Sequence, residues 1–259
     1  MIGVFDSGLG GLGVLADIRR LEPRADLVAL ADQAHAPYGD RPPESVAAWT
    51  HAAADHLIGL GCDTVVIACN TASTVALASL RAARPDTAFV GMEPAVKPAA
   101  DSTGTGVIAV LGTTRTIEGP LLASVVERFG AGHRVLPIAL PGLVDLIEDG
   151  LVDGEATGRL LAARLAPALE AGADTYVLAC THYGFARHRI EEVVGEATVI
   201  DPAEAVARQA LRVHPEAAAG SGTLALLTTG DPVRMRRQVG LILGWDDPVA
   251  PVRLSVPVR

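Results

Sequence analysis

The chain has 259 residues, of which 49% are hydrophobic and 20% charged, the ordinary composition of a soluble globular protein with a full core. Its formal net charge of -9 argues against a broad surface for nucleic acid or anionic membranes. No apolar run approaches the ~18–20 residues of a membrane span, the N-terminus lacks a signal-peptide pattern, and three cysteines make no disulfide framework. We therefore expect a cytoplasmic protein with free thiols and no nucleic-acid or membrane partner.

Short apolar runs rich in β-branched residues alternate along the chain with Ala- and Leu-rich stretches of helical period. Strands are predicted at residues 2–5, 27–31, 64–68, 88–91, 106–111, 134–139 and 175–179. Helices are predicted at 10–21, 43–60, 71–83, 154–172 and 202–213. Strands that alternate with helices of this length indicate βαβ units, so we expect an α/β fold with mainly parallel sheets.

One sequence pattern, Gly-x-Asp-Thr-x-Val-x-Ala-Cys, occurs twice. "GCDTVVIAC" ends at Cys69 and "GADTYVLAC" ends at Cys180. Upstream of each lies a strand that ends in a small polar turn with glycine, "IGVFDSG" and "GVIAVLGTT". This repetition predicts two similar α/β domains, with the stretch after about Ile200 returning to the first. The expected domains are residues 1–95 with 201–259, and residues 96–200.

Both repeated cysteines end a predicted strand, where open α/β sheets place their ligand crevices. A helix starting after each would favour the thiolate and lower the thiol pKa, and His182 could exchange protons with Cys180. If the two domains face each other about a pseudo-twofold axis, both thiols flank one cavity at the interface. One thiol could then take a proton from a carbon while the other delivers one to the opposite face. A lone strand-end cysteine is more often a small core residue, and we expect this of Cys62.

The segment "FDSGLGGLGV" offers a different interpretation. It has the outline of a dinucleotide-binding fingerprint, G-x-G-x-x-G with an acidic residue ending the next strand: Gly8, Gly10, Gly13 and Asp32. Against it, the Asp6 carboxylate would lie where the pyrophosphate binds. Asp6 and Ser7 fit better as a polar pair aimed into the crevice, or Asp6 as a helix cap. A nicotinamide-dependent oxidoreductase stays open as an alternative.

Other motifs allow more than one interpretation. "APYGD", residues 36–40, predicts a tight turn. Thr113, Thr114 and Thr116 in "LGTTRT" could bind a carboxylate or cap a helix. Glu148 lies near a predicted helix end, where solvent exposure is the default. Cys180 and His182 supply two metal ligands, but no second close pair completes a zinc site.

Eight segments together resemble the cofactor-independent aspartate/glutamate racemase superfamily, in order over nearly the whole chain. They are "GVFDSGLGGLGVL", "APYGDR", "ACNTAS", "GMEPAVKPA", "VLGTTRTIEG", "LVDLIEDG", "LACTHY" and "TTGDP". The resemblance implies two α/β domains with the active site between them, and interconversion of L- and D-glutamate without a cofactor or metal. In bacteria this reaction supplies D-glutamate for peptidoglycan. The resemblance also allows a homodimer.

Matched residue by residue, the resemblance makes Cys69 and Cys180 the two catalytic acid/bases. It places Asp6 as an assisting group on the Cys69 side, and Glu148 with His182 on the Cys180 side. It implies that a further set binds the substrate or lines its site: Asp6, Ser7, Pro37, Tyr38, Gly39, Asn70, Thr71, Thr113, Thr116, Thr181 and His182.

The chain departs from this family pattern at five positions: Ala179, Gly184, Gly13, Gln33 and His35. None of them is a proposed catalytic group, yet they leave a weakly active relative with a binding or regulatory role as another alternative. A pyridoxal enzyme would need a lysine for its Schiff base, and Lys97 is the chain's only one.

Overall fold

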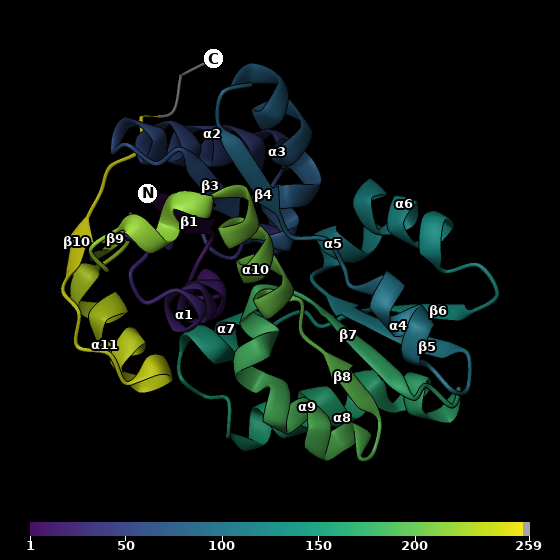
Figure 1. Cartoon of the computed structure of the whole chain (residues 1–259). Coiled ribbons are helices and arrows are strands. Elements are labelled where there is room, and N and C mark those ends of the chain that lie inside the picture. Colours follow the sequence, from purple (N-terminus) through teal and green to yellow (C-terminus); the bar gives the residue numbers. More distant parts are fainter. Residues whose placement is uncertain (256–259) are drawn as a thin grey trace. The chain divides into compact units, whose positions relative to one another are not determined.

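The computed structural model describes residues 1–255; residues 256–259, which the predicted first domain includes, lie outside the described part. The chain forms two compact units (Figure 1). The first comprises Met1–Met92 and the segment that begins at Ala203, and the second comprises Glu93–Pro202. Each unit contains its own parallel sheet with helices, which confirms the predicted α/β class. Within the described residues, none of the helices combines the length and apolar character needed to cross a bilayer.

The sheet of the first unit has six strands in the order β10-β9-β2-β1-β3-β4, all parallel. The strands are β1 (Ile2–Asp6), β2 (Leu27–Ala31), β3 (Thr64–Ile67), β4 (Ala88–Gly91), β9 (Leu224–Thr228) and β10 (Val249–Pro251). The central strand β1 pairs Asp6 with Ala31 of β2 and Phe5 with Ile67 of β3. The carboxyl ends of these three strands therefore lie side by side at one edge of the sheet.

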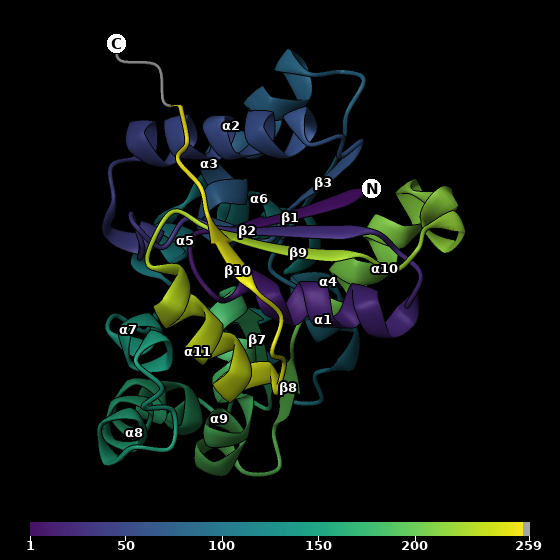
Figure 2. The ribbon, with the colours of Figure 1, turned by 90° about the vertical axis from the view of Figure 1, so that its left-hand side faces the viewer.

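Helices cover both faces of this sheet (Figure 2). On one face lie α2 (Pro43–Gly59) and α3 (Asn70–Ala83), and on the other lie α1 (Gly11–Leu21), α10 (Ala203–Val213) and α11 (Pro232–Leu243). Phe5, Leu30 and Ile67 of the strands pack with Leu57 of α2 and Leu80 of α3 in one buried cluster. Short 3₁₀ helices, η1 (Tyr38–Asp40) and η3 (Pro215–Ala219), complete the unit.

The second unit repeats this topology with four parallel strands in the order β6-β5-β7-β8. The strands are β5 (Val107–Gly112), β6 (Arg134–Ala139), β7 (Thr175–Ala179) and β8 (Thr198–Ile200). The helices are α4 (Val96–Ser102), α5 (Thr114–Glu118), α6 (Pro120–Phe129), α7 (Leu143–Glu148), α8 (Glu155–Glu170), η2 (Thr181–Ala186) and α9 (Arg187–Val194). Ile108 and Val110 pack in the cluster of α4 and α6, whereas Ala109 and Leu111 pack in the cluster of α8 and α9. Alternate residues of β5 thus point to opposite faces of the sheet and pack in two separate hydrophobic clusters.

The aspartate of the repeated pattern has a structural role in both units. Asp63 precedes β3, and its carboxylate lies 3.4 Å from the N-terminal ammonium, next to the start of β1. Asp174 precedes β7 and accepts hydrogen bonds from Thr103 Oγ1 at 2.5 Å and Thr105 N at 2.8 Å, just before β5. Burial opposes ionisation of Asp174, but these hydrogen bonds prevail and lower its pKa to about 2. Each aspartate therefore ties its cysteine strand to the entry of the central strand.

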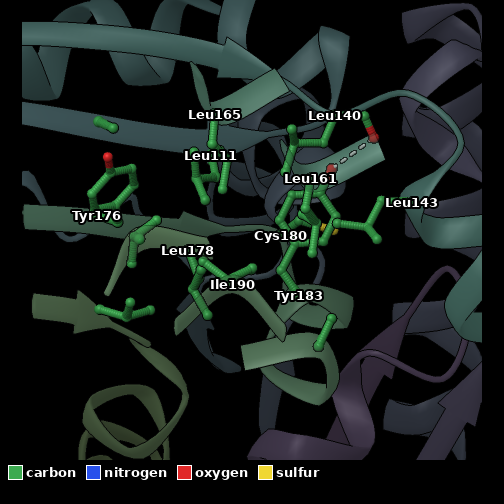
Figure 3. Close-up of a cluster of buried hydrophobic side chains, with 14 of the residues drawn as sticks. Leu111, Leu140, Leu143, Leu161, Leu165, Tyr176, Leu178, Cys180, Tyr183 and Ile190 are labelled. Carbon is green, nitrogen blue, oxygen red and sulfur yellow. Dashed lines mark hydrogen bonds between the residues drawn. The ribbon is translucent and has the colours of Figure 1, made fainter. Parts of the chain in front are cut away.

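Tyr176 on β7 is fully buried, and its hydroxyl has no hydrogen-bond partner among the described residues. Figure 3 shows it on the far side of the cluster from Cys180 and Tyr183. Because an unsatisfied buried hydroxyl costs about 1–3 kcal/mol, we expect Tyr176→Phe to raise the free energy of unfolding by about 1 kcal/mol. Urea denaturation followed by circular dichroism measures the change.

Tyr183→Phe is the matched control in the same core. Its hydroxyl donates to the carbonyls of Gly112 at 3.2 Å and Leu140 at 3.3 Å, and Figure 3 shows the bond to Leu140. Loss of the hydroxyl should lower the free energy of unfolding by about 1 kcal/mol. A Tyr176→Phe variant that loses as much stability as Tyr183→Phe would mean that the Tyr176 hydroxyl is satisfied.

Candidate active site

Cys69 is at the end of β3 and caps the N-terminus of α3, as the sequence predicts. Its sulfur accepts a hydrogen bond from the backbone N–H of Ala72 at 3.4 Å. The side chain is nearly buried, with 6% of the residue exposed. The N–H groups in the first turn of a helix have no partner within the helix, and together with the positive end of the helix dipole they favour a thiolate over a thiol. The predicted position of Cys69 at the start of a helix is therefore confirmed.

Asp6 and Ser7 form a polar chain that ends at this thiol. The Cys69 thiol donates to Ser7 Oγ at 3.6 Å, and Ser7 Oγ donates to Asp6 Oδ1 at 3.3 Å. Asp6 also accepts from the backbone N–H of Gly8 at 3.0 Å. The N-cap of α1 is Gly10, so Asp6 organises the turn before the helix and is not its cap. The expected polar pair is present, and hydrogen bonds connect it to Cys69.

The glycine-rich turn serves packing against Asp6. A Cβ placed on Gly11 would lie 2.8 Å from the Cβ of Asp6, so only glycine lets α1 approach the end of β1 this closely. The Asp32 carboxylate, which a dinucleotide would need for its ribose, is buried and accepts hydrogen bonds from Tyr38 and Thr229. This arrangement does not support the dinucleotide-binding alternative.

We expect Gly11→Ala to lower the free energy of unfolding by about 1–2 kcal/mol, because the added methyl group must displace Asp6 or α1. Gly59→Ala is the matched control, since a Cβ at the end of α2 meets nothing within 4 Å. That control should be neutral or stabilising by up to ~1 kcal/mol. Equal losses in the two variants, measured by urea denaturation, would refute the close-packing explanation.

Three further candidates come from the loop before α2, and two from the start of α3. Pro37, Tyr38 and Gly39 follow the cis peptide bond between Ala36 and Pro37, and Tyr38 belongs to the same buried cluster as Cys69. Asn70 and Thr71 are buried at the first positions of α3. The amide of Asn70 has neither its oxygen nor its nitrogen hydrogen-bonded to a described residue. A buried amide of this kind is typical of a position that a ligand satisfies.

Cys180 follows β7 in the second unit and is 7% exposed. The sequence predicts a helix start here like the one after Cys69, and the structure corrects this. The 3₁₀ helix η2 follows Cys180 without a side-chain cap, and α9 begins only at Arg187. Tyr183 holds η2 in place, because its hydroxyl donates to two carbonyls of neighbouring segments. The environment of Cys180 therefore depends on side chains more than on a helix dipole.

His182 and Glu148 supply that environment. His182 Nε2 lies 2.8 Å from Glu148 Oε1, and their side chains are 3% and 11% exposed. The solvent-exposed position expected for Glu148 is thus wrong: the end of α7 packs against η2 and buries the carboxylate. Burial disfavours the charged imidazole, but hydrogen bonds with Cys180 and Glu148 outweigh it and raise the pKa of His182 well above its usual value.

Thr113, Thr116 and Thr181 lie on segments next to Cys180. Gly112 of β5 pairs with Ala179 of β7, so Thr113 and Cys180 leave adjacent strands. Thr113 caps α5: its hydroxyl accepts from Thr116 N at 3.3 Å and lies 3.1 Å from Thr116 Oγ1. The capping interpretation is therefore correct for Thr113, whereas Thr116 lies inside α5 and supplies the N–H that is capped. Substrate binding would be an additional role. Thr181 begins η2.

Other chemistries find little support among the described residues. Lys97 lies on α4 with its side chain 62% exposed and paired with Asp101 at 2.9 Å, which is unlike a Schiff-base lysine in a closed site. Cys62 is a core residue as expected, and burial raises its pKa to about 11. All three cysteines are free thiols.

Comparison with known proteins identifies the family of the chain. Residues 15–210 match the family model described as Asp/Glu/Hydantoin racemase. A glutamate racemase from Roseiflexus sp. (strain RS-1) is 46% identical over 240 residues, which cover 90% of this chain and 88% of the relative. The crystal structure of glutamate racemase isoform RacE1 from Bacillus anthracis superposes with a TM-score of 0.90 at 29% identity, covering 99% of this chain and 98% of that one.

A second solved structure adds a ligand. The Escherichia coli glutamate racemase in complex with L-glutamate and the activator UDP-MurNAc-ala has a TM-score of 0.84 at 26% identity, over 98% of each chain. The family match covers well over half of the chain, and the Roseiflexus relative is similar over nearly all of it. The chain therefore belongs to the Asp/Glu/hydantoin racemase family, in its glutamate racemase branch.

Proposed function

We propose that this glutamate racemase inverts its substrate by two-base proton transfer at the α-carbon, with Cys69 serving one face and Cys180 the other. The observation that supports this most is the presence, in each unit, of one nearly buried free cysteine at a strand end with its own polar relay. The relay of Cys69 is Ser7 and Asp6, and that of Cys180 is His182 and Glu148. Two unlike relays suit two groups that must exchange protonation states at every turnover.

In one direction, the Cys69 thiolate removes the α-proton and the C–H electron pair stays on the carbon. The Cys180 thiol then delivers its proton to the opposite face and becomes a thiolate. The enzyme is left with the inverse protonation state, which serves the reverse reaction. Protonated His182 stabilises the negative sulfur of Cys180, and Ser7 with Asp6 lets Cys69 exchange its proton.

The difficult step is the formation of negative charge beside a carboxylate. Preorganised donors aimed at that carboxylate lower the barrier. We assign this role to the N-terminus of α3 with Asn70 and Thr71, and to Thr181 at the start of η2. The unsatisfied buried amide of Asn70 fits a group waiting for a substrate oxygen. Thr113, Thr116 and the loop with Pro37, Tyr38 and Gly39 complete the substrate contacts that we propose.

We propose glutamate as the substrate, because the Escherichia coli relative binds L-glutamate and the curated relatives are glutamate racemases. The reaction needs no cofactor on this mechanism. In bacteria, D-glutamate enters peptidoglycan, so we propose that the enzyme acts in the cytoplasm to supply cell-wall synthesis.

Circular dichroism of L-glutamate incubated with the purified, cofactor-free protein tests the proposal. The signal should decay to zero, and in D2O the product should carry deuterium at the α-carbon. L-Aspartate in the same assay should keep its signal. A constant glutamate signal, or inversion without deuterium uptake, would exclude two-base proton transfer.

A further inference from the structure

A buried carboxylate in the first unit holds the loop of Tyr38, and the mechanism above gives it no role. Asp32 directly follows β2 and is fully buried. It accepts hydrogen bonds from Tyr38 Oη at 2.6 Å and Thr229 Oγ1 at 2.5 Å, and His35 Nδ1 lies 2.9 Å from it. Burying a carboxylate is costly unless its oxygens are satisfied, and these three contacts satisfy it. Asp32 is therefore the centre of a hydrogen-bond network and not an isolated buried charge.

Tyr38 connects this network to the cysteine. Its ring packs against Phe5 and Trp49, with ring centroids 6.3 Å and 5.5 Å apart, in the cluster that contains Cys69. Burial raises the pKa of Tyr38, and the negative charges of Asp32, Cys69 and Asp6 raise it further. The hydroxyl is thus a permanent donor to Asp32.

Two departures from the family pattern lie in the segment that follows Asp32, and one of them, His35, contacts Asp32. His35 stacks on Trp49 with ring centroids 4.1 Å apart while it contacts Asp32. Gln33 donates to Gln238 of α11 at 3.0 Å and accepts from Thr228 Oγ1 at 3.1 Å. The loop from residue 33 to residue 41 is therefore tied to the C-terminal segment of the chain.

We propose that Asp32 is a positioning residue for substrate binding, which fixes Tyr38 and its loop beside Cys69 by accepting the Tyr38 hydroxyl. The proposal rests on the proposed function, because the loop is taken to line the glutamate site. Asp32 itself touches no reacting atom. Its effect should therefore appear in KM and leave the proton-transfer step nearly unchanged.

Asp32→Asn keeps the side-chain shape but replaces one acceptor oxygen by a donor. We expect KM to rise about tenfold for both enantiomers, as for the loss of one hydrogen bond to a charged group, with kcat changed less than about twofold. Tyr38→Phe should give a similar rise. The double variant should exceed neither single variant by more than about twofold, because Asp32 acts through the Tyr38 hydroxyl.

Asp26→Asn is the matched control, since Asp26 lies just before β2 as Asp32 lies just after it. Its carboxylate also holds the C-terminal segment, through Ser221 and Thr223, at the end of the sheet away from Cys69. KM should not change in this control. An unchanged KM in Asp32→Asn, or single-variant effects that multiply in the double variant, would overturn the proposal.

Two additions keep the test decisive. If Asp32→Asn fails to fold, Thr229→Val can replace it, because it removes one donor to the same carboxylate. We expect KM to rise about threefold in this variant, which in free energy is about half of the tenfold rise expected for Asp32→Asn. Hydrogen exchange of residues 33–41 needs no turnover: Asp32→Asn should speed it at least tenfold relative to Asp26→Asn. Equal exchange in the two variants overturns the proposal even if the wild-type protein racemises glutamate, whereas absent racemisation with faster exchange overturns only the proposed function.

Discussion

Cys69→Ser and Cys180→Ser should each lower kcat for racemisation of glutamate by about 10²–10⁴-fold, the range that a positioned acid/base contributes. A serine hydroxyl is somewhat smaller than the thiol and can make the same kinds of hydrogen bond, but it remains protonated near neutral pH and cannot serve as the base. The loss should appear in both directions, because each cysteine must act as base for one enantiomer and as acid for the other. Initial rates with L- and D-glutamate, followed by circular dichroism, measure the effect.

Cys62→Ser is the control for this pair. Cys62 is a free, buried cysteine of the first unit that packs in the core near Leu57, and no proposed substrate contact involves it. We expect a loss of about 1–2 kcal/mol in the free energy of unfolding, from burying a hydroxyl, with kcat unchanged. A Cys69→Ser or Cys180→Ser variant as active as this control would remove that cysteine from the mechanism.

The sequence predicts most of the sheet, because parallel strands buried on both faces are continuous apolar runs. All seven predicted strands are present, from β1 to β7. Three strands are missing from the prediction: β8, β9 and β10. β8 and β10 have only three residues each, and β10 includes a proline. The sequence does not predict α9 for another reason. Its sequence, "RHRIEEVV", is mostly charged, and only Ile190 and Val194 are buried. Its position depends on packing, which a local pattern does not contain.

The candidate site also has parts that the local sequence predicts and parts that depend on long-range contacts. The relation of Cys69 to α3 is local, and the order of strand, cysteine and small polar residues is enough to predict it. The pairing of Glu148 with His182 joins residues 34 positions apart, so only the family resemblance suggested it. The contact of Asp32 with Thr229 spans 197 positions, and the sequence suggested a role for Asp32 only in the alternative dinucleotide-binding interpretation. Long-range polar networks of this kind depend on the tertiary fold.

Glu148→Gln should lower both activity and stability, because it removes the carboxylate that keeps His182 protonated in a buried place. Without it, burial dominates and the pKa of His182 falls. At pH 7 we expect kcat to fall about 10–100-fold, because a neutral imidazole stabilises the Cys180 thiolate less. The free energy of unfolding should drop by about 3 kcal/mol, as for other broken buried pairs.

The pH dependence of this stability loss identifies its cause. A folded-state pKa raised above the unfolded value of about 6.5 contributes stability that is fully present below that value. The contribution disappears as the pH rises through the folded-state pKa of His182, since both states then bind no proton. The difference between the wild type and Glu148→Gln should therefore be largest near pH 6 and shrink in alkaline solution.

Asp153→Asn separates this effect from the general loss of a histidine–carboxylate pair in the second unit. Asp153 Oδ1 lies 2.7 Å from His188 Nε2, but the two side chains are 82% and 52% exposed. Solvent screens such a pair, so its loss should cost less than ~1 kcal/mol and leave kcat unchanged at every pH. Because the two variants differ chiefly in burial, a Glu148→Gln stability loss that stays constant from pH 6 to pH 9 would show that His182 is neutral in the folded protein. Cys180 would then have to form its thiolate without a neighbouring cation.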